Sequence, residues 1–267
     1  MKEMIKCMGC MKDYPKQRQV CPYCGYPQNT DGVHTAFQRP RTILSDRYVI
    51  GKAFHRDSIG ISYIGWDNLI EKKVVIKEYF PEHIAFRIDG QEIVSEPKWE
   101  KLYETGKREF LKEIENWSYL GKNSRVAKVY DQTEQYGTAY YIREYVKGQT
   151  LRQVLEQENP ILFGQARHWM RQLIQILREL WQYGFVHGNL SIDSIVVSED
   201  EMKLINFGIH SVESKAKGSV LDRNPYIPPE LYEENDRFWQ KADIYASAAV
   251  FYRMVTGEPV CFADRKG

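Results

Sequence analysis

Long apolar runs are missing from this chain of 267 residues. No uninterrupted stretch approaches the roughly 20 apolar residues that a membrane-spanning helix needs. The first residues also lack the apolar core of a signal peptide. From these two absences we expect a cytoplasmic protein with no membrane segment in this chain.

The chain also lacks a large excess of charge of either sign. The 37 basic and 36 acidic residues leave a formal net charge of +1, so no overall field attracts nucleic acid or an anionic membrane. Either partner would need a local basic patch. The aromatic content of 13% argues against a disordered chain, and the length allows a substantial core.

Cysteine is scarce outside the first 24 residues, which hold Cys7, Cys10, Cys21 and Cys24 as two C-x2-C pairs. Four thiolates at this spacing can surround Zn²⁺ tetrahedrally. The alternative is a disulfide pair, which the cytosol disfavours. We therefore predict a structural zinc site whose metal supplies folding energy to a segment too short for a core. The fifth cysteine, Cys261, has no partner motif and is interpreted as an incidental thiol.

The charge of this segment bears on nucleic-acid binding. Its five basic and two acidic residues sum to +3, and a Zn(Cys)4 centre contributes about −2. The basic residues are Lys2, Lys6, Lys12, Lys16 and Arg18, and the acidic residues are Glu3 and Asp13. The small remainder favours a protein-contact or spacer role, and we expect no nucleic-acid partner.

Sequence patterns divide the rest of the chain. Residues 1–30 are expected to form the zinc ribbon and residues 31–45, which are polar and rich in turn formers, a linker. A β-rich region follows, with one amphipathic helix inside it, and then a helical region. The expected strands are 48–53, 59–66, 73–79, 127–132 and 138–146, and the expected helices are 107–120, 150–156, 164–183 and 242–256.

A series of motifs then falls in a recognisable order. Residues 74–77 read V-V-I-K, 144–148 read E-Y-V-K-G, 187–190 read H-G-N-L, 206–208 read N-F-G and 228–230 read P-P-E. From residue 46 onward the chain resembles a bacterial serine/threonine protein kinase domain, and the cysteine segment is similar to zinc ribbons that precede such domains. The resemblance implies an α+β, bilobal protein kinase-like fold with a β-rich N-lobe at 46–147 and a partial helical C-lobe at 148–267. The chain stops soon after the buried αF-type helix, so we expect either a truncated polypeptide or a reduced large lobe.

The resemblance also identifies the positions where phosphoryl-transfer chemistry is missing. Asn189 stands at the catalytic base, Ser194 at the second metal contact and Asn206 at the metal-binding aspartate. An amide has neither the charge to hold Mg²⁺ nor the basicity to accept a hydroxyl proton. We therefore expect no catalytic residues. The alternative is that Asp193 replaces a lost carboxylate.

The nucleotide pocket is altered as well. The resemblance implies that Lys77 and Glu113 form its ion pair, which could be purely structural. His55 and Asp57 replace two glycines of the phosphate loop, so that only Gly60 remains. Asp57 would repel a polyphosphate by on the order of 3 kcal/mol per charge at about 5 Å and an effective dielectric near 20.

Two larger side chains are expected to crowd the base pocket. Val75 replaces the usual alanine above the adenine ring, and Arg143 occupies the gatekeeper position. We hypothesise that Arg143 contacts Glu113 and blocks the back of the pocket. The alternative is that Arg143 extends along its aliphatic stem to solvent.

The remaining family positions are interpreted as structural. His187 and Phe207 are expected in the core, and Asp243 is expected to be a buried anchor bonded to the loop backbone. Gly188 replaces the arginine that grips an activation-segment phosphate. The segment 209–227 contains Ser211, Ser214 and Ser219, which we interpret as solvated loop serines.

These observations predict an inactive kinase-like (pseudokinase) module for binding, scaffolding or regulation. It carries structural zinc, is not expected to use ATP or Mg²⁺, and has unidentified protein partners. The alternatives are an ATP-binding serine/threonine-type kinase with residual or non-standard phosphoryl or nucleotidyl transfer, and a metal-independent nucleotide sensor.

Overall fold

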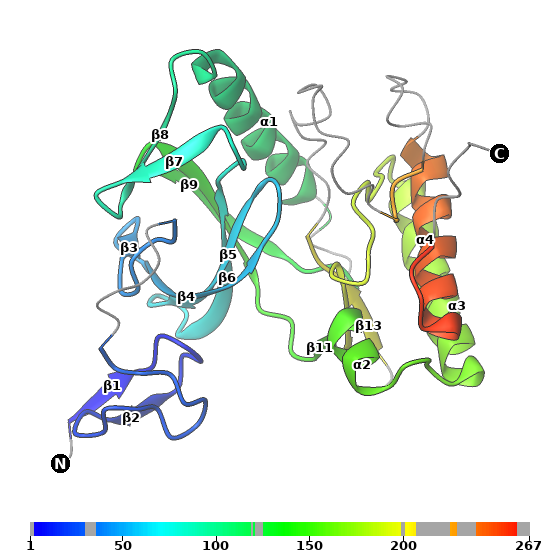
Figure 1. The fold of residues 1–267 in the computed structure, drawn as a ribbon, viewed down its shortest axis with the longest axis horizontal. Helices are drawn as coiled ribbons and strands as arrows, with labels where there is room; N and C mark the ends of the chain where they lie inside the picture. Colours follow the sequence, from blue (N-terminus) through cyan, green and yellow to red (C-terminus); the bar gives the residue numbers. More distant parts are fainter. Residues whose placement is uncertain are drawn as a thin grey trace. The chain divides into compact units, whose positions relative to one another are not determined.

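The computed structural model describes residues 3–29, 36–118, 120, 125–198, 201–206, 225–228 and 239–260 (Figure 1). The chain divides into two compact units. The first comprises Met1–Lys122 and Lys128–Tyr145, and the second comprises Asn123–Ala127 and Val146–Gly267. The first unit thus holds the cysteine-rich segment together with the β-rich lobe, and the second holds the helical lobe.

The cysteine-rich segment begins with a small hairpin. Strands β1 (Met4–Lys6) and β2 (Asp13–Pro15) pair antiparallel, with Ile5 opposite Tyr14. Tyr14 is 1% exposed and packs against Cys7 and Cys21. This small core agrees with a segment that depends on a metal for its stability.

The β-rich lobe is built on one antiparallel sheet of order β3-β4-β5-β6-β10-β9. The expected strands are confirmed, with small shifts at their ends. Their bounds are β3 Ile43–Leu44, β4 Tyr48–Arg56, β5 Gly60–Asp67, β6 Lys72–Tyr79, β9 Val129–Gln135 and β10 Thr138–Glu144. The late part of the expected linker also enters the fold, because Gln38 and Leu44 are fully buried.

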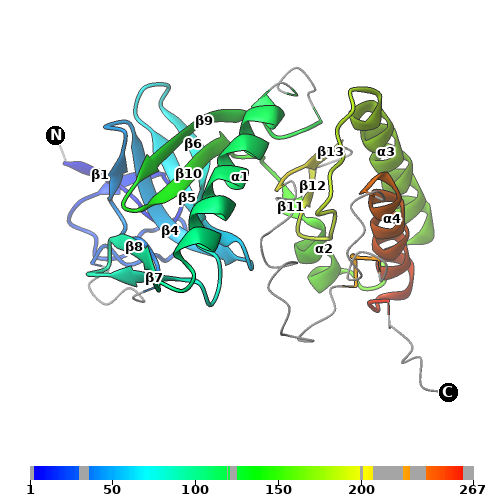
Figure 2. The same ribbon diagram turned by 90° about the horizontal axis from the view of Figure 1, so that it is seen from above.

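The two faces of this sheet bear different groups. Glu78 pairs with Tyr140 across the sheet, whereas Lys77 pairs with Tyr141 on the opposite face. Helix α1 (Glu100–Ser118) lies on the Lys77 face, with the rings of Phe110 and Tyr141 5.4 Å apart (Figure 2). The helix begins at Glu100 rather than at residue 107, so the sequence prediction found its apolar stripe but missed its first turns.

A second hairpin, absent from the sequence prediction, precedes α1. Strands β7 (Ala85–Ile88) and β8 (Glu92–Ser95) form a two-stranded sheet. Arg87 from β7 reaches the Glu78 carboxylate, and neither side chain is exposed. The hairpin is therefore fastened to the lobe by a buried ion pair.

In its described residues, the second unit contains three helices and a small sheet. Helices α3 (Phe163–Gln182) and α4 (Trp239–Thr256) pack against each other (Figure 2). Helix α2 (Leu151–Gln157) starts with a capping box between Thr150 and Gln153. The sheet has the order β11-β12-β13, with bounds β11 Gln149–Thr150, β12 Ile195–Ser198 and β13 Glu201–Leu204.

The expected helices are thus confirmed. Among the described residues, none of the helices is both long and apolar enough to cross a membrane.

Candidate functional site

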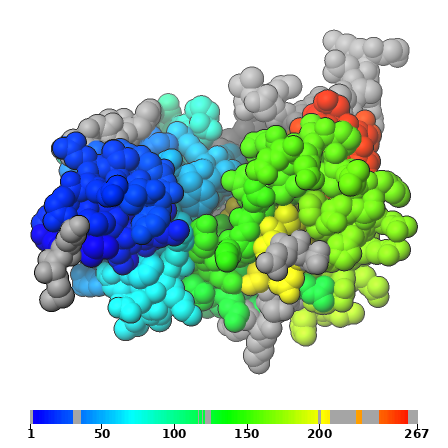
Figure 3. Space-filling model, turned by 90° about the horizontal axis from the view of Figure 1, so that it is seen from below, coloured from blue at the N-terminus to red at the C-terminus, as the bar shows by residue number. Residues whose placement is uncertain are grey.

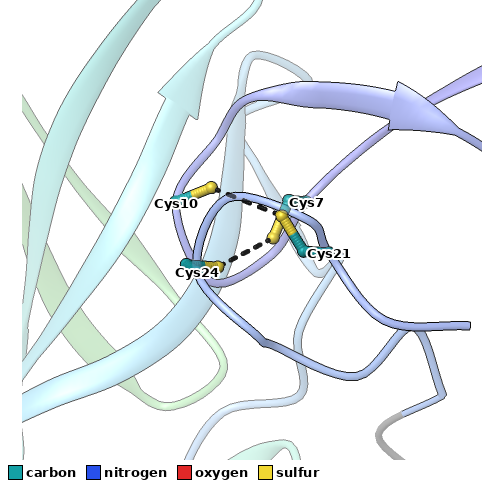
Figure 4. A group of neighbouring side chains, drawn as sticks. All are labelled: Cys7, Cys10, Cys21 and Cys24. Carbon is teal, nitrogen blue, oxygen red and sulfur yellow. Dashed lines mark hydrogen bonds between the residues drawn. The ribbon is translucent and has the colours of Figure 1, made fainter.

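The four cysteines converge as their spacing predicts. Their sulfur atoms all lie within 4.8 Å of one another, and Figure 4 shows the side chains pointing to a common centre. The Cys7 and Cys24 sulfurs are 3.6 Å apart, and those of Cys10 and Cys21 are 3.8 Å apart. Four sulfurs around Zn²⁺ at about 2.3 Å would be about 3.8 Å apart, so the cluster fits a tetrahedral Zn(Cys)4 site.

Backbone N–H groups donate to sulfurs of this cluster, although burial still raises the pKa of Cys7 and of Cys10. The N–H of Gly9 donates to the Cys7 sulfur at 3.3 Å. Burial alone would raise the pKa of Cys21, but the N–H groups of Tyr23 and Cys24 favour its thiolate, and its pKa falls to about 7. Since metal binding requires deprotonated sulfur, these donors favour the loaded state.

Three basic side chains of the ribbon have acidic or aromatic partners. Lys6 pairs with Asp13 at 2.9 Å, and Lys16 pairs with Glu3 at 2.6 Å. The Lys12 ammonium lies over the Tyr23 ring. This internal pairing reduces the charge available to a phosphate backbone, in agreement with the weak nucleic-acid case made from composition.

In the β-rich lobe, Lys77 is engaged by the residue that replaces a phosphate-loop glycine. Lys77 is 4% exposed, and its ammonium forms an ion pair with the Asp57 carboxylate. Among the described residues this is the only ion pair of Lys77. Lys77 is thus paired with Asp57, and the pairing with Glu113 that the family pattern predicts stays a prediction.

Asp57 is held in this position from several sides. Its other oxygen accepts hydrogen bonds from the N–H groups of Ile59 at 3.1 Å and Gly60 at 2.9 Å. The His55 imidazole lies 3.7 Å from the oxygen that faces Lys77. The two residues that replace glycines thus form one cluster with Lys77.

Electrostatics support an ionised Asp57. Burial alone would raise the pKa of Asp57, but Lys77 and His55 outweigh it and hold that pKa well below its usual range. Burial lowers the pKa of Lys77, and the nearby Arg143 charge adds to this effect. Asp57 therefore supplies negative charge at a position where the resemblance implies ligand phosphates.

Packing between strands explains why glycine is kept at position 60 of this loop. A Cβ atom on Gly60 would overlap the backbone oxygen of Glu78 on the neighbouring strand. The close approach of β5 and β6 requires glycine here whether or not a phosphate binds.

The gatekeeper side chain lies inside the lobe. Arg143 is 3% exposed, so the alternative in which it extends into solvent is wrong. Its guanidinium donates to the backbone oxygen of Glu144 at 3.0 Å. Burial lowers the pKa of Arg143, and the neighbouring Tyr141 partly offsets this shift. The proposed contact with Glu113 stays a prediction. Val75, the residue directly opposite Arg143 on β6, is also buried.

In the second unit, Asp243 anchors the loop that begins at His187, as predicted. Its carboxylate accepts hydrogen bonds from the N–H groups of His187 at 2.9 Å and Gly188 at 2.8 Å, and from the Trp181 indole at 3.1 Å. Burial raises the pKa of Asp243, and these donors partly offset it. His187 is fully buried, which confirms its expected place in the core.

Two substituted positions of this loop have local roles. The Ser194 hydroxyl accepts from the Ser191 N–H at 2.8 Å and donates to the Ser191 carbonyl at 3.0 Å. The N–H of Asn189 donates to the His187 ring at 3.3 Å. Ser194 thus closes a turn with its hydroxyl.

The third substituted position, Asn206, adopts a left-handed backbone with φ of 53°, which asparagine tolerates well. The neighbouring Phe207 and Gly208 lie outside the described residues. So do Ser211, Ser214, Ser219, Pro229, Glu230 and Cys261.

Asp193, the alternative base, is engaged by a residue that the sequence prediction did not consider. The Arg152 guanidinium binds both carboxylate oxygens of Asp193 at 2.6 Å. This ion pair occupies both carboxylate oxygens of Asp193. Arg152 lies in the first turn of α2, outside the motifs identified in the sequence, so no motif pointed to it.

Comparison with known proteins agrees with this architecture. The sequence profile described as "Protein kinase domain" matches residues 89–267. The chain therefore belongs to the protein kinase domain family. A solved structure described as "PpkA-294 apo form" superposes with a TM-score of 0.71 at 24% identity, covering 84% of this chain and 80% of that one, which supports the fold.

Related sequences include bacterial serine/threonine-protein kinases. The chain is 26% identical to the serine/threonine-protein kinase PknB of Mycobacterium leprae over 231 residues, covering 83% of this chain and 34% of that protein. It is 24% identical to PrkC of Bacillus subtilis over 219 residues, covering 80% and 31%. The chain thus spans about a third of the length of these curated relatives.

Proposed function

We propose that this chain is a catalytically inactive kinase-like domain that serves as a binding, scaffolding or regulatory module, with a structural zinc ribbon. The ion pair between Asp57 and Lys77 is the observation that carries the proposal. Lys77 stands where the family places the lysine that pairs nucleotide phosphates. A ligand phosphate would have to displace a carboxylate already bound to it.

The substitutions in the second unit point the same way. Asn189 and Asn206 are amides where phosphoryl transfer needs carboxylates, and the Ser194 hydroxyl is used within its own turn. Asp193 is bound by Arg152, which argues against its serving as a substitute base. Positioning and metal electrostatics act jointly in this reaction, so losing several of these groups at once removes most of the rate enhancement.

A metal-independent nucleotide sensor is the second candidate. Arg143 is buried close enough to Lys77 to lower its pKa, so two cations share one region of the lobe. A second cation could neutralise part of a phosphate charge that Mg²⁺ neutralises in active kinases. This candidate requires Asp57 to leave Lys77.

For partners, we propose another protein rather than nucleic acid, because Lys6, Lys12 and Lys16 of the ribbon already have acidic or aromatic neighbours. A thiolate metal site also suits a reducing compartment, so we propose a cytoplasmic location.

Thermal unfolding with ATP separates these functions. An inactive module without nucleotide binding shows no shift at millimolar ATP, with or without Mg²⁺ or Mn²⁺. A sensor shows an equal shift with and without metal. A shift that requires the metal, lost in Lys77→Ala, contradicts the proposal.

A transfer assay tests catalysis directly. The chain is incubated with ATP labelled on the γ- or the α-phosphate and a generic protein acceptor. We expect no incorporation into either protein. Label transfer that disappears in Lys77→Ala would establish an active enzyme, and its loss in Asp193→Asn would identify the substitute base.

A further inference from the structure

The metal-binding turn of the ribbon is hydrogen-bonded to the sheet. Met8 lies between the ligands Cys7 and Cys10, and its backbone oxygen accepts a hydrogen bond from the Lys52 N–H on β4 at 2.7 Å. In the space-filling view the ribbon, in dark blue, abuts the lighter blue and cyan residues of the same unit (Figure 3). The residues that hold the metal are thus joined to a strand of the lobe.

Apolar packing reinforces this contact. Met8, Met11 and Ile64 form a buried cluster, with Val49 and Trp66 packed against it. Gly51 leaves space for it, because a Cβ atom there would overlap Met11 and the Met8 oxygen. At the edge of the cluster, the Lys6 ammonium lies 3.6 Å from the centre of the Trp66 ring.

Strand β4, which carries this contact with the ribbon, leads directly to the Asp57 ion pair. Among the described residues, β3 pairs with β4 at Tyr48 and Val49, and the backbone of Ile50 is hydrogen-bonded to Arg41 and Thr42. Farther along this edge, the next backbone contact is the one between Lys52 and Met8. Beyond Lys52, β4 continues to Arg56, and Asp57 follows. The contact with the ribbon therefore lies on the short path between the metal ligands and Lys77.

We propose that the ribbon is a metal-dependent clamp on β4, which keeps Asp57 on Lys77 when Zn²⁺ is bound and releases it when the metal is lost. A segment with so small a core folds only around its metal, so the Met8 and Met11 surface exists only in the loaded state. Whatever binds the folded ribbon must then also stabilise the strand that packs on it. This inference is independent of whether the domain transfers phosphate.

Hydrogen exchange on the full chain tests the clamp. Exchange is compared for the Zn²⁺-loaded protein and for the same protein after chelation. We expect amides of residues 52–57 to exchange at least tenfold faster without the metal, while amides of α3 in the other unit keep their rates. Faster exchange confined to residues 3–29 would overturn the proposal.

Variants of the interface separate the clamp from general unfolding. Met11→Ser keeps all four ligands but removes the apolar contact from the ribbon. Gly51→Val places a bulky side chain on β4, which pushes the ribbon away from the sheet. Each should retain Zn²⁺ by metal analysis, yet show fast exchange at 52–57 that chelation no longer changes.

Val20→Ser is the matched control, since Val20 lies on the ribbon and is 51% exposed. It should respond to chelation like the unmodified protein. If Met11→Ser loaded with Zn²⁺ also behaves like the unmodified protein, the contact does not transmit the metal state and the clamp is excluded.

Discussion

The guanidinium of Arg87 lies 2.6 Å from the carboxylate of Glu78, and both side chains are fully buried. The hydroxyl groups of Tyr63 and Tyr140 donate to the same carboxylate, each at 2.7 Å. A buried charge with this many partners is costly to leave unmatched.

Removing one member of this cluster should therefore destabilise the first unit strongly. We expect Glu78→Gln to lower the free energy of unfolding by about 3–5 kcal/mol, because Arg87 then stays buried without a counter-charge. Urea denaturation followed by tryptophan fluorescence measures this. Glu82→Gln is the control, since its pair with Arg56 is solvent-exposed and should contribute at most about 1 kcal/mol. Equal losses in the free energy of unfolding for the two variants would show that the buried pair stabilises the protein no more than the exposed pair.

Freeing Lys77 should open the pocket to nucleotide. We expect Asp57→Asn to strengthen ATP binding roughly tenfold to a hundredfold, because it removes both the bound carboxylate and its repulsion of phosphate. Isothermal titration with ATP in the absence of metal checks this. The double variant with Lys77→Ala should lose the gain. Unchanged affinity in Asp57→Asn would mean that Asp57 does not close the site.

The same ion pair predicts a pH dependence. The pKa of Asp57 is lowered on folding, so its stabilising contribution is present above the unfolded-state pKa of about 3.9 and is lost as pH falls through the lower folded-state pKa. The difference in free energy of unfolding between the native chain and Asp57→Asn should be largest near pH 7 and shrink below about pH 4. Thermal or urea unfolding of both proteins across this range measures it. A difference that grows on acidification contradicts the assignment.

Even a conservative substitution of Asp243, the anchor in the second unit, should lower the stability of the protein. Asp243→Asn replaces one of two acceptor oxygens by a donor, which faces either the Gly188 N–H or both the His187 N–H and the Trp181 indole. We expect a loss of about 2–3 kcal/mol in stability, measured by urea unfolding. Ile244→Ala, at the next and largely exposed position of α4, should cost within about 0.5 kcal/mol. A similar cost for both would exclude a special role for the carboxylate.

Much of the fold was accessible from the sequence because periodicity and motifs are local. The strands β4 to β6 and the buried α4 follow from local residue patterns, and the convergence of the four cysteines follows from their spacing. The anchoring by Asp243 followed from its family motif.

The partners of charged side chains were less accessible, because pairing depends on geometry between distant segments. The pattern identified Asp57 as an obstacle to phosphate but not as the partner of Lys77. Strand register could have suggested it, since Ser62 pairs with both His55 and Lys77 across the sheet. No motif in residues 81–99 indicated that Arg87 would be buried in a hairpin.

The Met8 and Met11 contact also bears on where this protein can be cut. A shortened polypeptide that starts at residue 46 keeps every kinase-like motif, yet it leaves Ile64, Val49 and Trp66 without their cover. An uncovered apolar patch promotes self-association. The start of the kinase-like motifs therefore differs from the start of the smallest polypeptide that should fold without self-association. That polypeptide includes the cysteine-rich segment.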